Sequence, residues 1–149
     1  MTGGRGLIGI VSGLGPLAGS DVLDKLLQHA ARRYGAIEDV DYPDVLLYSH
    51  GIDEFDQTGG TDDRFRDELL GIVDELERHE PELVGVACNT AHLYLDEMRA
   101  HTGAHIVDLI EEVATRAAAR PVRHLLLSSS MTRRTRLYHD RLDCYGVSS

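Results

Sequence analysis

Short apolar runs alternate with amphipathic segments along almost the whole chain, and this alternation restricts the fold more than any other feature. The expected strands are GLIGIVSG (6–13), DVLLYSH (44–50), ELVGVAC (82–88), the beginning of 104–120, and VRHLLLSSS (122–130). Segments with apolar residues at helical spacing follow them, at 16–34, 63–79, 91–101, in the rest of 104–120, and at 132–146. Strands of this length, each followed by a helix, predict an α/β fold, a doubly wound parallel sheet with helices on both faces.

Composition and charge exclude several classes of protein. The chain has 149 residues, the length of one ordinary domain, and a net charge of −10, which argues against a nucleic-acid surface. No apolar run is long enough to span a bilayer, and the first residues lack the apolar core of an export signal. The two cysteines, Cys88 and Cys144, are too few for a disulfide framework, and no metal-ligand spacing accompanies them. We therefore expect a cytoplasmic protein with reduced thiols, no bound metal, and no membrane or nucleic-acid partner.

Three loops are expected at the carboxyl ends of the strands, the edge at which open parallel sheets bind ligands. They are SGLGP (12–16), SHGIDEF (49–55) and CNTAH (88–92). Cys88 ends a strand and begins a helix, where free N–H groups and the helix dipole favour a thiolate. Asn89 and Thr90 follow it with short polar side chains, while Gly13 and Gly15 allow backbone N–H groups to approach a ligand. The pattern predicts a nucleophilic or proton-transferring thiol that faces a small anion.

Each of these residues also has a purely structural interpretation. A single cysteine at the end of a buried strand is most often a small apolar packing residue, and we expect a packing role for Cys144. The glycines of 12–16 do not form the GxGxxG pattern of a dinucleotide site. His92 is either a general acid or base, or a cap of the helix that follows Cys88. The residues alone leave these alternatives open.

Three ordered motifs of the chain resemble those of the aspartate/glutamate racemase family. They are IGIVSGLGPLAGSDVL (8–23), VACNTAH (86–92) and LLLSSSMTRRTRLYHDRL (125–142). The pentapeptide CNTAH is similar residue for residue to the one around the family's first catalytic cysteine, which Cys88 matches. In the third motif, Ser129 and Thr132 stand at two family threonines and Tyr138 at a tyrosine. The resemblance implies that Cys88 is catalytic, and that the substrate site is formed by Ser12, Gly13, Leu14, Gly15, Pro16, Asn89, Thr90, Ser129 and Thr132.

The same resemblance implies a cofactor-independent amino-acid racemase or epimerase. In this family two cysteines face each other across the substrate α-carbon, because removing a proton from one face and delivering one to the other requires two acid–base groups. Members fold as two similar α/β domains related by a pseudo-twofold axis, and each domain provides one cysteine. By this correspondence, 1–121 is the N-terminal racemase-like domain, and 122–149 is the incomplete start of the second, with one strand and one helix. The chain is then one half of a pseudo-symmetric fold, and a truncated racemase.

Four features depart from the family pattern. The second cysteine motif, of the Gly-Cys-Thr-Glu type, does not occur in the chain. The arginine that follows the second strand in family members that recognise acidic amino acids is also missing from 49–60. Gly19 stands in place of the usual threonine, and Ser12 stands in place of a glycine.

Three hypotheses of function follow. The first is a racemase that completes its site as a homodimer, with two Cys88 thiols across one cleft, or by association with a complementary half. The second is a single-cysteine decarboxylase or isomerase that acts beside a carboxylate. The third is a non-catalytic half-domain that binds a small anion or a partner chain. Because the covering domain is missing, we also expect association through apolar residues around Leu125, Leu126, Leu127 and Leu137.

Overall fold

A four-stranded parallel sheet forms the centre of the molecule, with the strand order β2-β1-β3-β4. The computed structural model describes residues 6–52, 63–120 and 122–147. The strands are β1 (Leu7–Ser12), β2 (Asp44–Ser49), β3 (Leu83–Val86) and β4 (His105–Ile106). In the register of the sheet, Ile10 lies between Leu47 of β2 and Gly85 of β3. The predicted parallel α/β sheet is therefore confirmed for the first four strands.

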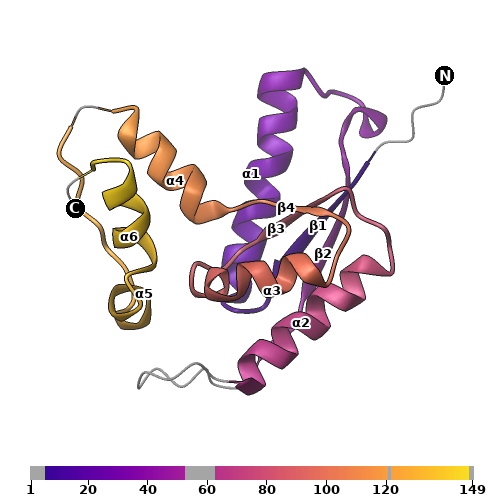
Figure 1. The fold of residues 1–149 in the computed structure, drawn as a ribbon. Coiled ribbons are helices and arrows are strands. Elements are labelled where there is room, and N and C mark those ends of the chain that lie inside the picture. Colours follow the sequence, from indigo (N-terminus) through magenta and orange to yellow (C-terminus); the bar gives the residue numbers. More distant parts are fainter. Residues whose placement is uncertain (1–5, 53–62, 121, 148–149) are drawn as a thin grey trace.

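Helices cover both faces of this sheet (Figure 1). Helix α1 (Pro16–Tyr34) lies on one face, and α2 (Asp63–Glu77) and α3 (Leu95–Ala100) lie on the other. Helix α1 has the bounds predicted from the sequence, because Pro16 is accommodated in its first turn and Gly35 ends it in a left-handed conformation. The main core lies between the sheet and α2, where the fully buried side chains include Val11, Leu69, Ile72, Val73, Leu76 and Val84.

A second, smaller core lies in the C-terminal part of the chain. The helices of this part are α4 (Leu109–Ala118), α5 (Ser130–Arg134) and α6 (Leu137–Cys144). The buried residues of this core are Ile110 and Ala114 from α4, and Tyr138 and Leu142 from α6. Arg141 of α6 also pairs with Glu111 of α4. The division of the chain at residue 121 remains a prediction, and α4 packs against the segment that follows this boundary.

The prediction of a fifth strand at 122–130 is wrong. Residues 123–129 have no strand conformation, and the helix α5 begins at Ser130. Leu125 and Leu127 are each 84% exposed, whereas Leu126 packs against the second core. The apolar alternation of a strand is thus present, but none of the described strands lies beside this segment to supply the ladder hydrogen bonds that a strand requires.

Two predicted helices are divided in the structure. The helix expected at 132–146 is broken at Arg136, whose φ of 54° is left-handed, so that α5 and α6 are separate. The helix expected at 91–101 begins as a five-residue 3-10 turn, η2 (Thr90–Tyr94), before α3 starts. A short 3-10 helix, η1 (Asp39–Asp41), also precedes β2. Cys144 is exposed at the end of α6, so its expected packing role is wrong as well.

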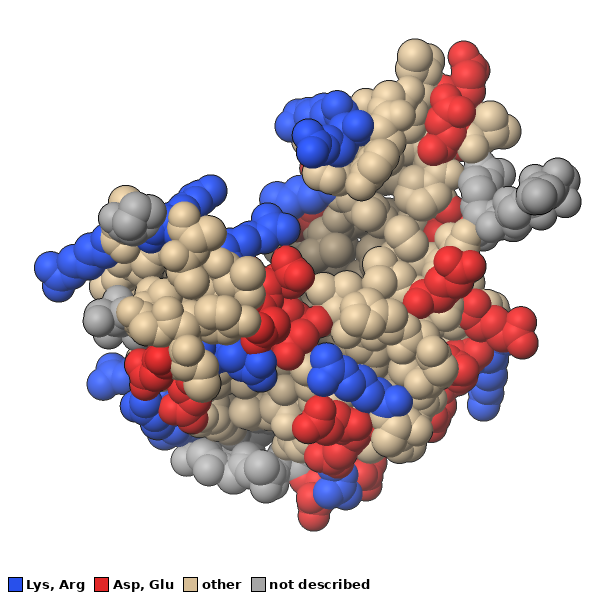
Figure 2. Space-filling view, turned by 45° about the horizontal axis from the view of Figure 1, so that its top comes forward, with Lys and Arg blue, Asp and Glu red and all other residues tan. Residues whose placement is uncertain are grey.

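A groove on the α1 face of the sheet remains uncovered by other helices. It has a volume of about 340 Å³ and lies between α1 and the start of α4, over residues such as Gly85 and Val107. Figure 2 shows this surface as a hollow in which uncharged residues predominate, with charged side chains around it. In the part of the chain that the structure describes, no helix combines the length and the apolar character needed to cross a bilayer.

Candidate active site

The loops after β1 and β3 meet at the carboxyl edge of the sheet, as the sequence predicts. Gly13 has a φ of 102°, and a Cβ built on it would lie 1.9 Å from the carbonyl oxygen of His50. Gly15 has a φ of 105° and open space around it. Only glycine adopts these conformations without strain, and only glycine allows the β1 loop to lie directly against the end of β2. The close approach at Gly13 holds the loop after β1 against the end of β2, beside the site.

Cys88 lies just after β3, and its thiol is partly buried. Burial raises the pKa of this thiol, and the backbone N–H groups of Ala91 and Thr90, which act in the opposite direction, offset the rise only in part. The expectation that a helix N-terminus favours the thiolate is therefore corrected. The turn η2 that follows Cys88 has only five residues, too few for a strong dipole, and desolvation dominates the pKa.

Hydroxyl groups from two distant segments surround the loop that carries Cys88. The hydroxyl of Thr90 lies 3.3 Å from that of Thr132, which in turn accepts a hydrogen bond of 3.0 Å from Ser129. Tyr138 donates a hydrogen bond of 2.5 Å to Oδ1 of Asn89. Because Oδ1 accepts from Tyr138, the amide nitrogen of Asn89 is the group that can donate to an anion. Burial raises the pKa of Tyr138, and the negative charge of Asp108 adds to this effect.

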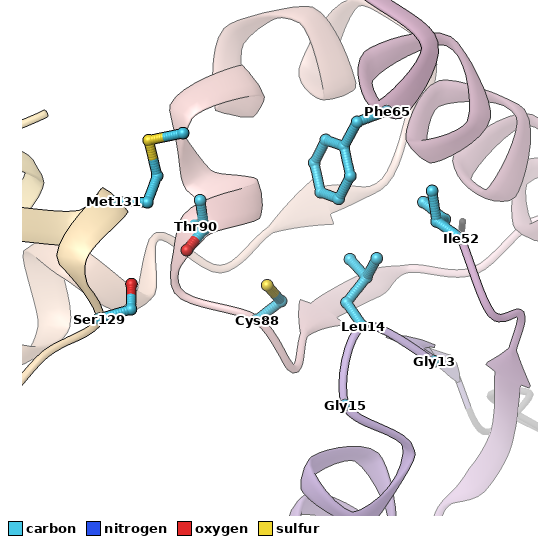
Figure 3. Close-up of a pocket in the computed structure, with 9 residues that line it drawn as sticks. All are labelled: Gly13, Leu14, Gly15, Ile52, Phe65, Cys88, Thr90, Ser129 and Met131. Atoms are coloured by element: carbon cyan, nitrogen blue, oxygen red, sulfur yellow. The ribbon is translucent and has the colours of Figure 1, made fainter. Parts of the chain in front are cut away.

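Three cavities reach Cys88, the groove beside α1 and two cavities that also contact the hydroxyl groups. Of these two, one has a volume of about 310 Å³ and is lined by Gly13, Leu14, Gly15, Ile52, Phe65, Cys88, Thr90, Ser129 and Met131. The other, of about 390 Å³, shares Leu14, Cys88, Thr90 and Ser129, and extends to Asn89, Thr132 and Tyr138. Figure 3 shows Thr90 and Ser129 on one side of Cys88, and Leu14, Ile52 and Phe65 on the other. The thiol thus lies between a hydroxyl-rich region and an apolar region.

The structure brings most of the predicted site residues together and leaves two apart. Gly13, Leu14, Gly15, Cys88, Asn89, Thr90, Ser129 and Thr132 line one or both of these cavities. Ser12 is 1% exposed and lies against α1, and Pro16 begins α1 without lining either cavity. The sequence reasoning missed Ile52, Phe65 and Met131. Apolar residues in helical or strand-end positions carry no signal that separates a cavity lining from a core.

His92 connects the Cys88 loop to the start of α4. It is 5% exposed, and its Nδ1 lies 2.9 Å from the carbonyl oxygen of Cys88. Its Nε2 accepts a hydrogen bond of 3.2 Å from the backbone N–H of Leu109. Because the carbonyl oxygen of Cys88 can only accept and the N–H of Leu109 donates, the ring proton lies on Nδ1 and Nε2 carries the free lone pair. Of the two interpretations from the sequence, the geometry supports a structural tie, since both ring nitrogens are already engaged by the backbone.

Replacing His92 with alanine is expected to lower the free energy of unfolding by about 2–3 kcal/mol, because two buried backbone groups lose their partner. Urea denaturation measures this loss. The matched control is alanine at the partly exposed His101, whose Nδ1 lies 2.8 Å from Asp74 at the surface. That substitution should lower the free energy of unfolding by less than about 1 kcal/mol. Equal losses in the two variants would contradict the role assigned to His92.

Ser12 and Gly19 face each other across the interface between β1 and α1. A Cβ built on Gly19 would lie 1.9 Å from the Oγ of Ser12 and 2.5 Å from its Cβ. The Ser12 hydroxyl is buried and has no hydrogen-bond partner among the described residues. Ser12 and Gly19 are therefore one structural unit, in which the strand carries the side chain and the helix carries none.

Gly19→Ala is expected to destabilise the protein by about 1–3 kcal/mol because of this overlap, although alanine usually stabilises a helix interior. Adding Ser12→Gly should remove most of the loss, which gives a favourable coupling energy of about 1 kcal/mol or more in a double-mutant cycle. Chemical denaturation of the four proteins measures it. Gly71→Ala in α2 is the control, since no atom lies within 4 Å of its built Cβ. If the changes in the free energy of unfolding caused by the two substitutions were simply additive, Ser12 and Gly19 would not form one structural unit.

No group of three or more potential metal ligands occurs among the described residues. The thiol, hydroxyl and amide groups around Cys88 are suited to proton transfer and to hydrogen bonding with a carboxylate.

Comparison with known proteins adds an independent finding. A family model described as Asp/Glu/Hydantoin racemase matches residues 11–149. The broad specificity amino-acid racemase RacX of Bacillus subtilis (strain 168) is 25% identical over 140 residues, which is 94% of this chain and 62% of RacX. The crystal structure of an aspartate racemase homologue from Pyrococcus horikoshii OT3 is 29% identical, with a TM-score of 0.73 over 95% of this chain and 62% of that one.

A second structure, the aspartate racemase of Picrophilus torridus, is 23% identical with a TM-score of 0.80, and this likeness concerns the fold. It covers 96% of this chain and 61% of that chain. The chain therefore spans about three fifths of the length of each of these relatives.

Proposed function

Because the chain belongs to the Asp/Glu/Hydantoin racemase family, we propose that Cys88 transfers the α-proton of a small amino acid without an organic cofactor. The observation that carries this proposal is the position of Cys88. Among the described residues, Cys88 is the one titratable side chain that both cavities share, and the hydroxyl and amide groups of Asn89, Thr90 and Ser129 line the same cavities.

The proposed step is a proton abstraction. The thiolate of Cys88 takes the proton from the α-carbon, and the electron pair of that C–H bond moves into the substrate carboxylate. The hydroxyl of Thr90 and the amide nitrogen of Asn89 donate hydrogen bonds to the carboxylate oxygens, where the negative charge increases. The raised pKa of the thiol means that little thiolate is present at neutral pH, but the thiolate that forms is a stronger base.

Racemisation needs a second acid on the opposite face of the α-carbon, since one thiol alone returns the proton to the face it came from. The other cysteine of the chain, Cys144, is exposed at the end of α6 and lines neither of the two cavities. We propose that the second group comes from outside residues 1–149. A homodimer with two Cys88 thiols across one cleft, or a complementary half, would provide it. Leu125 and Leu127, both 84% exposed, support such an association.

A second candidate is a half-domain that binds a small anion or a partner chain without catalysis. The observation that favours it is the raised pKa of Cys88, which keeps the thiol protonated at neutral pH. A single-cysteine decarboxylase or isomerase is the further alternative, and release of CO2 or isomerisation of an unsaturated diacid would identify it. Because both cysteines are free, we also propose a reducing compartment, the cytoplasm.

The test is proton NMR of the purified chain in D2O with a panel of L-amino acids that includes aspartate and glutamate. The expected result is loss of the α-proton signal of at least one amino acid. Chiral chromatography of the same samples then distinguishes exchange with retention, expected of isolated chains, from racemisation, expected of a completed site. No exchange with any amino acid would overturn the proposal in favour of the binding half-domain.

A further inference from the structure

The apolar side chains beside Cys88 indicate which kind of substrate side chain the site accepts. In the cavity of about 310 Å³, Leu14, Ile52 and Phe65 provide the side chains away from the hydroxyl groups, and Met131 lies on the side of Thr90 and Ser129 (Figure 3). Figure 3 shows Leu14, Ile52 and Phe65 grouped on the side of Cys88 opposite Ser129. A substrate whose carboxylate lies at the hydroxyls, with its α-carbon at the thiol, has room for its side chain in this apolar region.

Charge is absent from the described lining of both cavities, which contains no Lys, Arg, Asp or Glu. Arg66 follows Phe65 in α2, but it lies 2.9 Å from Asp63, 2.8 Å from Asp67 and 3.8 Å from Glu97. Arg133 and Arg134 follow Met131 and Thr132 in α5, and both are exposed. The sequence of residues 53–62, which lie outside the described part, contains no Lys or Arg.

A substrate side chain with a carboxylate would enter this apolar region without a counter-ion. Removing an ionised carboxylate from water costs several kcal/mol when no partner is present. An aliphatic or aromatic side chain gains free energy in the same place, in proportion to the apolar area it buries. The lining thus opposes aspartate and glutamate and favours side chains without charge.

We propose that the site recognises α-amino acids with an uncharged, apolar side chain, rather than acidic amino acids. This inference rests on the proposed function only for the placement of the α-carbon at Cys88. Discrimination between methionine and glutamate, which are similar in length, is expected to be at least about tenfold in affinity.

The experiment measures protection of Cys88 from alkylation by iodoacetamide, an uncharged reagent, at pH 9. In a Cys144→Ser background Cys88 is the only thiol, because the chain has two cysteines. Leucine and methionine should slow alkylation at concentrations at least about tenfold lower than aspartate and glutamate require. Equal or better protection by glutamate, or no protection by any amino acid, would overturn the inference.

A charge-introducing variant tests the cause of the preference. Ile52→Arg places a cation at the apolar region and should shift the ratio of glutamate to leucine protection about tenfold toward glutamate. The matched control is Ile37→Arg, since Ile37 is 81% exposed and lines neither cavity. The control should leave the ratio unchanged. A shift of equal size in both variants would show that overall charge, not the lining, sets the preference.

The two proposals fail in different ways. Protection by leucine without α-proton exchange would reject the catalytic role and keep the recognition of an apolar side chain. Exchange that is fastest with glutamate would keep the catalytic role and reject the apolar substrate.

Discussion

Replacing Cys88 with serine is expected to lower the rate of α-proton exchange by about 10²–10⁴-fold, the contribution of a positioned acid–base group. Serine is close to cysteine in size, so the packing around the loop is preserved, but its hydroxyl does not ionise in the accessible pH range. The rate is measured by NMR in D2O with the amino acid that the native chain exchanges fastest. Cys144→Ser is the control, because Cys144 is exposed at the end of α6 and should not affect the rate.

The pH dependence of exchange follows from the same thiol. Burial raises the pKa of Cys88, and the thiolate is the active form, so the native rate should increase with pH through the range in which an ordinary thiol has already ionised. It should level off only above that range. A rate that is already constant at neutral pH would show that the thiol is ionised there and would contradict the dominance of desolvation. A full rate in Cys88→Ser would show that another group is the base.

Gly13→Ala is expected to lower the free energy of unfolding by about 3–5 kcal/mol, the largest stability effect in the site. Two independent costs add here. A φ of 102° strains any residue with a Cβ, which costs about 1–3 kcal/mol. The new Cβ would also lie 1.9 Å from the carbonyl oxygen of His50, which is backbone and gives way only if the loop after β2 moves.

Gly15→Ala separates these two costs. Gly15 has nearly the same φ, 105°, but no atom lies within 4 Å of its built Cβ, so this variant carries the strain without the overlap. Urea denaturation of both variants should show a loss at Gly13 that exceeds the loss at Gly15 by about 1–3 kcal/mol. Equal losses would mean that the close approach between the two loops contributes nothing.

The part of the fold that local patterns determine was predictable from the sequence. Helix α1 has the predicted bounds because Pro16 and Gly35 mark its two ends. The segment at 122–130 was not predictable in the same way, since its apolar alternation is present but a strand also needs a neighbouring strand. The break at Arg136 was equally hidden, because a left-handed φ at a residue other than glycine leaves no trace in composition.

The candidate site shows the same division. Cys88, Thr90 and Gly13 were found because they follow predicted strands at the carboxyl edge, where open parallel sheets bind ligands, and because they lie in motifs that resemble those of a known family. Phe65 was read as one apolar position in the stripe of a helix, and the stripe does not reveal which member reaches a cavity. The hydrogen bond from Tyr138 to Asn89 joins positions 49 residues apart, and only the packing of α6 against α4 brings them together.

The overlap between positions 12 and 19 also limits which substitutions this interface accepts one at a time. While Ser12 is present, any residue larger than glycine at 19 would place its Cβ 1.9 Å from the hydroxyl oxygen of Ser12. A larger residue at 19 therefore has to be introduced together with a smaller residue at 12, and a search for more stable variants has to change the two positions as a pair.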